Sequence, residues 1–70
     1  MTRAVLLTYS GAVHRVVSRD GADQTACGQT YRRHAQVTSK QALVFSLPEC
    51  HGGECWPPGA WRHFLEGTSP

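Results

Sequence analysis

The sequence has no long apolar segment. The early apolar run at residues 4–7, AVLL, is followed at once by Thr8, Tyr9 and Ser10. A membrane-spanning helix needs about 20 predominantly apolar residues, and a secretory signal needs an apolar core of about 7 to 15. The sequence therefore predicts neither, and we expect a cytoplasmic protein.

Charge is also scarce. The formal net charge is only +2, which is too small to indicate a strong, nonspecific nucleic-acid binder. The charges are unevenly placed, because residues 1–40 carry six basic and two acidic residues, whereas residues 41–70 carry one basic and three acidic residues. This asymmetry keeps a nucleic-acid partner open as an alternative.

Cysteine is limited to three residues, Cys27, Cys50 and Cys55. An odd number of cysteines in a reducing compartment argues against a disulfide framework. A chain of 70 residues forms at most one domain, here residues 1–70, and such small cores usually need a metal, disulfides or a partner subunit. Three thiolates lack one donor for a tetrahedral zinc shell, and the chain has four histidines that could supply it.

Short β-strands are predicted in the first half of the chain. Residues 4–9 and 12–18 are rich in β-branched and apolar residues, and Ser10-Gly11 between them suits a hairpin turn. Asp20-Gly21 is a dipeptide typical of tight hairpins, and residues 25–31 follow it as a third strand. These segments predict an antiparallel meander.

The second half is predicted to be less regular. Residues 32–41 are expected to form a loop or a ragged strand, and the apolar alternation in residues 42–47 favours a strand. A short helix is the alternative there, because Thr38 and Gln41 have the spacing of a capping box. After the Pro57-Pro58-Gly59 break, residues 60–67 have apolar residues at helical spacing and end in Gly67, a natural helix C-cap.

These elements predict a small, β-rich α+β fold. It consists of an antiparallel meander of three to four strands with a short C-terminal helix, stabilised by a structural zinc. A helix this short is not stable alone in water, so it must dock on the rest of the domain.

The stretch LPECHGGECW, residues 47–56, indicates one half of a zinc site. Cys50 and Cys55 are separated by four residues, a spacing found in structural zinc sites. Gly52-Gly53 allows the backbone to turn tightly, and prolines on either side stiffen the ends of the segment.

The other half of the site is predicted from strand register. If the Asp20-Gly21 turn joins two antiparallel strands, pairing about it sets His14 opposite Cys27. Directly opposed side chains lie on the same face, with Cβ atoms about 5 Å apart, although one bulge would break the register. The preferred zinc shell is therefore His14, Cys27, Cys50 and Cys55.

Other interpretations of the cluster are open. His51 adjoins Cys50, His34 lies in the basic segment, and His63 lies on the predicted helix; each is a competing fourth ligand. The simplest alternative is that the three cysteines are unrelated buried residues, because free cysteine is often buried as a small hydrophobe.

The order of His14, TACG at residues 25–28 and PECHGGEC at residues 48–55 resembles the small His-Cys-Cys-Cys zinc-binding proteins of actinobacteria and their phages. Their pattern has a histidine on an early strand, a TxCG-type turn and a terminal Cys-x2-Cys, whereas the terminal pair here has four intervening residues. The resemblance covers residues 12–55. It implies the same ligand set and a possible phage protein, but no activity.

A closed four-ligand shell leaves no open coordination position for catalysis. The sequence therefore predicts a zinc-stabilised, non-catalytic module with a binding or regulatory role that acts through a protein partner. The contact residues expected from their types, because tryptophan and arginine often anchor interfaces, are Tyr31, Arg32, Arg33, Trp56 and Trp61.

Two other functions are weighed against this one. TYRRH, residues 30–34, combines an aromatic ring with two arginines, as nucleic-acid binding by stacking and phosphate contacts requires. A thiol-dependent enzyme would need a nucleophilic cysteine activated by His51 or His63. No third orienting group is recognisable in the sequence, so we do not expect an enzyme.

Overall fold

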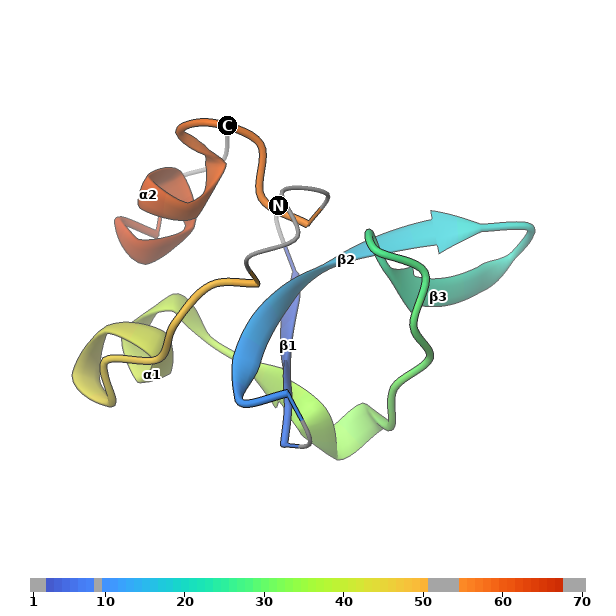
Figure 1. Cartoon of the computed structure of the whole chain (residues 1–70), viewed down its shortest axis with the longest axis horizontal. Coiled ribbons are helices and arrows are strands. Elements are labelled where there is room, and N and C mark those ends of the chain that lie inside the picture. Colours follow the sequence, from blue (N-terminus) through green and yellow to red (C-terminus); the bar gives the residue numbers. More distant parts are fainter. Residues whose placement is uncertain (1–2, 9, 51–54, 68–70) are drawn as a thin grey trace.

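The computed structural model describes residues 3–8, 10–50 and 55–67 (Figure 1). The predicted small α+β fold is confirmed, with a four-stranded antiparallel sheet and two short α-helices. In chain order the elements are β1 (Ala4–Leu7), β2 (Ala12–Arg19), β3 (Ala22–Thr25), the 3-10 helix η1 (Arg33–Ala35), β4 (Gln36–Val37), α1 (Ser39–Val44) and α2 (Ala60–Leu65).

The sheet has the strand order β3-β2-β1-β4. The first three strands form the predicted meander, and β4 adds to the free edge of β1. Strand β2 is the longest and is shared, because its first half pairs with β1, from Leu7↔Ala12 to Ala4↔Arg15, and its second half pairs with β3. This division leaves the first half of β2 open to another segment on the β3 side.

The third strand differs from its prediction. Strand β3 spans Ala22–Thr25 and not residues 25–31, because the hairpin turn is made by Asp20 and Gly21 alone. Both have positive φ, 52° and 77°, which is the conformation that tight two-residue hairpin turns require. Pairing therefore starts immediately at Arg19↔Ala22, and the chain turns away again after Thr25.

The strand prediction for residues 42–47 is wrong, and the helical alternative holds. Thr38 accepts the backbone N–H of Gln41, and the Gln41 side chain accepts the N–H of Thr38, so the capping box is complete at the start of α1. These two bonds satisfy donors that would otherwise be lost at a helix start. The polar segment 32–41, expected as a loop or ragged strand, contains η1 and the two residues of β4.

The predicted C-terminal helix is confirmed as α2. Gly67 follows it with a φ of 74° and donates its N–H to the Phe64 carbonyl, as a glycine after a helix end commonly does.

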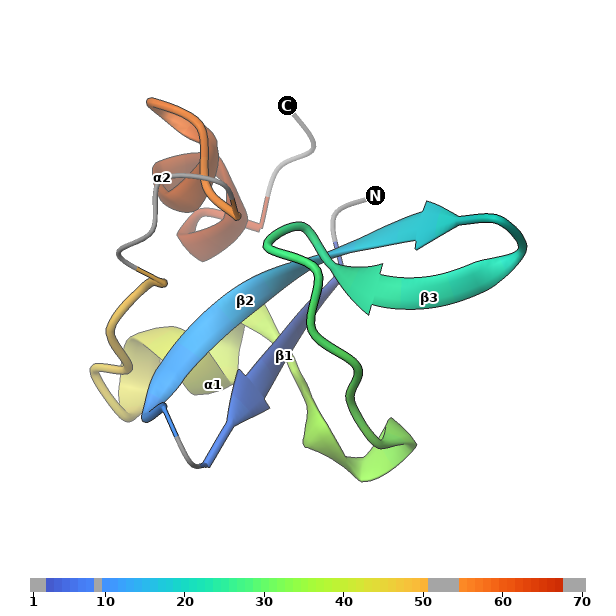
Figure 2. The same cartoon turned by 45° about the vertical axis from the view of Figure 1, so that its right-hand side comes forward.

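Both faces of the sheet are covered (Figure 2). On the face toward the helices, Ala4 and Val13 belong to a buried cluster that also includes Ala42, Cys55, Trp56 and Phe64. On the opposite face, Val5, Leu7 and Val16 pack with Tyr31 and Ala35, which lie on the segment that crosses in front of the sheet in Figure 2. The core is therefore divided into two small clusters, and neither alone provides a large buried volume.

Candidate metal centre

The buried polar residues in the described part of the chain are His14 and Thr25. Burying a polar side chain is unfavourable unless it has partners, so both residues need an explanation. His14 lies in β2, and Thr25 ends β3. Both side chains contact the same group of cysteines.

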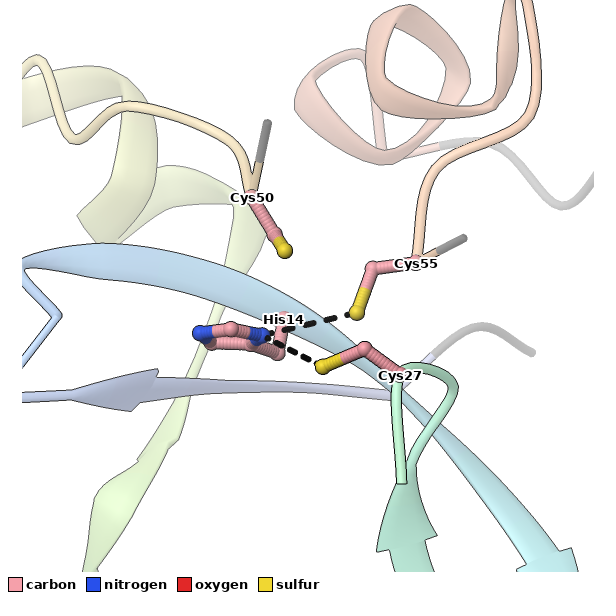
Figure 3. Close-up of side chains that lie close together, drawn as sticks. All are labelled: His14, Cys27, Cys50 and Cys55. Atoms are coloured by element: carbon pink, nitrogen blue, oxygen red, sulfur yellow. Dashed lines mark hydrogen bonds between the residues drawn. The ribbon is translucent and has the colours of Figure 1, made fainter. Parts of the chain in front are cut away.

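Four potential ligand atoms converge at this point (Figure 3). One atom from each of His14, Cys27, Cys50 and Cys55 lies within 4.8 Å of all the others. His14 comes from β2, Cys27 from the turn after β3, and the last two cysteines from the segments that lead to and from residues 51–54, which lie outside the described residues. All three cysteines are free thiols.

The His14 ring lies against two of the sulfurs. Its Nδ1 is 3.4 Å from Cys27 Sγ and 3.4 Å from Cys55 Sγ (Figure 3). In a tetrahedron with zinc–sulfur bonds of about 2.3 Å and zinc–nitrogen bonds of about 2.0 Å, the nitrogen–sulfur edge is roughly 3.5 Å. The observed spacing therefore matches the edge of a zinc tetrahedron.

The other ring nitrogen of His14 is held by Ser10. The Ser10 hydroxyl donates its single hydrogen to the Leu7 carbonyl at 3.2 Å, and Oγ lies 3.1 Å from His14 Nε2. With that hydrogen on the Leu7 carbonyl, Oγ is placed to accept a hydrogen from Nε2. This arrangement leaves Nδ1 without a proton and able to donate its lone pair to a metal. Burial also lowers the pKa of His14, which favours the neutral ring that metal binding needs.

Cys27 is positioned by a compact turn. The N–H of Gly28 is bonded to the Thr25 carbonyl at 2.9 Å, and Gly28 has a φ of 93°, which favours glycine. Thr25 Oγ1 accepts the N–H of Gln29 at 2.8 Å, so its own hydrogen is available for Cys27 Sγ at 3.1 Å. Burial acts to raise the pKa of Cys27, but the hydrogen bonds from Thr25 and the other two cysteines outweigh it and lower the pKa.

Cys50 is fixed to the open edge of β2. Val13 donates its N–H to the Pro48 carbonyl at 2.8 Å and accepts the N–H of Cys50 at 2.9 Å, which makes a parallel bridge between Val13 and Glu49. The residue after Val13 in the chain is His14. The same stretch of strand therefore positions a ligand of its own and one from a segment far along the chain.

Cys55 is fully buried, with an exposed fraction of 0%. Its carbonyl accepts a hydrogen bond from Arg15 Nε, and the next residue, Trp56, donates its indole N–H to the Val13 carbonyl at 2.8 Å. Burial raises the pKa of the Cys55 thiol to about 11. A buried thiolate is therefore unfavourable here unless a cation is bound beside it.

The donor set fits a zinc ion. Three thiol sulfurs and one imidazole nitrogen form a known structural zinc shell, and the spacing, tautomer and backbone anchoring above suit it. When bound, zinc would stabilise the thiolate form of the three cysteines. The four residues that converge are the four that the sequence predicted.

The predicted pairing of His14 with Cys27 has the correct offset between the two strands, but the two residues are not paired. The ladder between β2 and β3 has the predicted offset and ends at Val16↔Thr25. His14 and Cys27 are therefore not ladder partners, because the chain turns at Ala26, whose N–H is bonded to the Arg15 carbonyl. The turn brings the Cys27 sulfur to the His14 ring.

Two of the competing histidines lie elsewhere. His34 is exposed on η1 and His63 is exposed on α2, and neither belongs to the cluster of ligand atoms. His51, with Gly52 and Gly53, lies outside the described residues. Sequence reasoning missed Ser10 and Thr25. Their spacing from the predicted ligands could have indicated them, because Ser10 lies four residues before His14 and Thr25 two residues before Cys27.

The predicted contact residues have different environments. Trp56 is 5% exposed, and its ring centroid lies 5.0 Å from that of Trp61 and 5.2 Å from that of Phe64. Trp56 is thus part of the core, with little surface left for a partner, and Trp61 is half-buried against it. Tyr31 packs against the second core cluster, Arg32 is exposed and Arg33 begins η1.

Comparisons with protein-family models, with curated proteins and with solved structures gave no match. No helix in residues 3–8, 10–50 and 55–67 is long and apolar enough to cross a membrane. The resemblance to the His-Cys-Cys-Cys proteins stays a prediction.

Proposed function

We propose that this chain is a small zinc-stabilised, non-catalytic binding module in which the metal serves as a folding ligand. The observation that supports it is the convergence of His14, Cys27, Cys50 and Cys55, whose ligand atoms lie within 4.8 Å of one another. Four protein ligands complete a tetrahedral shell and leave no position for a substrate.

The chain needs such a ligand because its core is small. Two separate clusters of mostly small side chains provide limited hydrophobic stabilisation, whereas ordering each residue costs conformational entropy. Binding of structural zinc contributes an apparent free energy on the order of 10 kcal/mol in small domains, and this energy becomes folding free energy. The metal would link the hairpin of β2 and β3 to the segment that carries α2.

With the metal used for folding, the function lies on the surface of the module. A protein partner is the proposal that the sequence favours. A nucleic-acid partner would use residues 30–34, but Tyr31 is half-buried in the second cluster, which limits the stacking such a partner needs.

The decisive experiment measures the metal content of the purified, reduced chain and the visible spectrum of its cobalt form. We expect one zinc per chain and a spectrum typical of tetrahedral thiolate coordination. His14→Ala should lower the metal affinity sharply, whereas His34→Ala and His63→Ala serve as matched controls and should leave it unchanged. Folded, reduced protein without metal would contradict the proposal.

A further inference from the structure

A second feature of the surface lies apart from the metal centre. A pocket of about 760 Å³ opens between the end of β1, the segment around η1 and the end of α1. Its lining is largely apolar and includes Leu6, Tyr31, Val37, Phe45 and Leu47.

Three exposed apolar residues lie at the end of α1, beside this pocket. Leu43, Val44 and Phe45 are 60%, 66% and 68% exposed, and Phe45 also lines the pocket. Gln41 lines the pocket as well, and Val44 lies one helical turn after it, so the two are neighbours on the surface of α1. Large exposed apolar surfaces on monomeric proteins often mark binding sites. We call the pocket together with Leu43 and Val44 the apolar groove.

The charged residues that residues 24–48 contribute beside the apolar groove are basic. Arg32 lines the pocket and is exposed. Lys40 is exposed on α1, one turn before Val44. The sequence has no aspartate or glutamate between residues 24 and 48, so no acidic side chain of this segment offsets the two cations. Basic groups therefore flank the apolar surface from both the η1 side and the α1 side.

The floor of the groove includes the end of a strand. Strand β4 pairs with Ala4 and Val5 of β1, and the pairing described for this edge does not extend to Leu6. Leu6 lines the pocket, whereas the Leu7 carbonyl already accepts hydrogen bonds from Ser10 and Gly11. An incoming polypeptide could therefore reach backbone as well as side chains, as peptides that dock at sheet edges do.

We propose that the apolar groove binds a short acidic, apolar segment of another protein. The inference rests on the proposed function, because it assumes that the zinc-stabilised fold presents this surface. Complementary charge would orient the segment, and its apolar side chains would cover Leu43, Val44 and Phe45. A small molecule in the pocket alone would leave Leu43 and Val44 uncovered.

A second copy of the chain is a poor occupant of this groove. In a two-fold dimer the same surface patch lies on both subunits, so Arg32 and Lys40 of one copy would face the same basic groups of the other. A nucleic acid would satisfy the cations but would leave the three exposed apolar side chains without an apolar partner.

The test uses the zinc-loaded full chain and a displayed library of random 12-residue peptides. Peptides enriched by the chain are synthesised with a fluorophore, and their affinities are measured by anisotropy. We expect enriched peptides that combine Asp or Glu with Leu, Phe or Trp. The double variant Leu43→Ser/Phe45→Ser should weaken binding at least tenfold, and because both side chains are exposed it should still fold.

A second pair of variants tests the charge. Arg32→Glu should weaken binding about tenfold, whereas Arg62→Glu, an equal charge change on α2, should not. Added salt should reduce the affinity, because exposed charges are screened. Amide shifts in the NMR spectrum should locate the peptide near residues 6–8, 31–37 and 41–47.

Several results would overturn the inference. The inference would be contradicted if no peptides were enriched, or if the enriched peptides lacked acidic residues. It would also be contradicted if neither set of variants changed the peptide affinity. Concentration-dependent dimers that Phe45→Ser dissociates would contradict it too, as would stronger binding of a single-stranded RNA probe that competes with the peptides. Zinc content and a dispersed NMR spectrum are recorded on the same samples. Folded, zinc-loaded protein without peptide binding refutes only this inference, whereas protein without zinc refutes the proposed function.

Discussion

Ser10 and His14 are joined by a hydrogen bond of 3.1 Å between the serine Oγ and the imidazole Nε2. Ser10 lies in the turn between β1 and β2, and its hydroxyl donates to the Leu7 carbonyl. The hairpin turn thereby selects the ring nitrogen that faces the cysteines. Ser10 thus supports the tautomer of His14 in which Nδ1 carries no proton, without contacting any of the four clustered ligand atoms.

Replacing Ser10 should therefore weaken metal binding without removing a ligand. For Ser10→Ala we expect zinc affinity to fall by about tenfold or more, since outer partners of ligating histidines typically contribute factors of about 10 to 100. Competition against a chromogenic chelator measures the affinity, and ¹⁵N shifts of the imidazole report its tautomer. Ser10→Thr keeps a hydroxyl and should retain most of the zinc affinity. Ser18→Ala, in the same strand as His14, should change neither the affinity nor the tautomer. An unaltered affinity and tautomer in Ser10→Ala would disprove the role.

The Thr25 hydroxyl should stabilise both the turn after β3 and the Cys27 thiolate. Thr25→Val keeps the shape but removes the acceptor of the Gln29 N–H and the donor to Cys27 Sγ. We expect the free energy of unfolding of the zinc-loaded protein to fall by about 1–3 kcal/mol, the usual range for losing a buried hydrogen-bond partner. Chemical denaturation of Thr25→Val and Thr25→Ser measures the difference. A Thr25→Val protein as stable as the parent would show that the hydroxyl does not contribute, and a loss confined to Thr25→Ser would assign the effect to packing of the methyl group.

Removal of zinc should abolish the fold and not only a binding activity. Trp56 follows Cys55 directly and packs with Trp61 and Phe64 of α2, so loss of the ligand should release this aromatic cluster. We expect a chelator to collapse the near-ultraviolet circular dichroism of both tryptophans together and added zinc to restore it. A chelated protein that keeps a dispersed NMR spectrum would show that the metal is not a folding ligand.

Zinc affinity should rise with pH. Burial raises the pKa of Cys55 to about 11, so this thiol is protonated at neutral pH when no cation is present. Binding must expel that proton, and protons compete better with the metal as the pH falls. Calorimetry in buffers with different ionisation enthalpies should detect release of at least one proton per zinc near neutral pH. An affinity that stays constant between about pH 6 and 8 would be inconsistent with this linkage.

The proximity of His14 and Cys27 could be predicted from sequence because turn chemistry is local. Asp20-Gly21 sets the offset between β2 and β3, and that offset depends on two residues with positive φ. The partner segment of Cys50 could not be predicted in the same way. Its bridge to Val13 joins residues far apart in the chain, and no local pattern encodes such a pairing.

The segment at residues 42–47 shows a different failure. Its apolar alternation suggested a strand with one buried face, but Leu43, Val44 and Phe45 are all largely exposed. Alternating apolar residues indicate a strand only where one face of that strand is buried. Here the helix is determined by the Thr38–Gln41 capping box, and the apolar side chains point to a surface role that periodicity does not reveal.

The Val13 carbonyl accepts hydrogen bonds from both the Cys50 N–H and the Trp56 indole, so the two segments beside residues 51–54 are attached to one backbone oxygen. Every amino acid carries this oxygen. An alanine scan would therefore report only the packing of the Val13 side chain and would pass over the attachment. Replacing the peptide bond between Val13 and His14 by an ester, which weakens the carbonyl as an acceptor, is the chemical change that would reveal it.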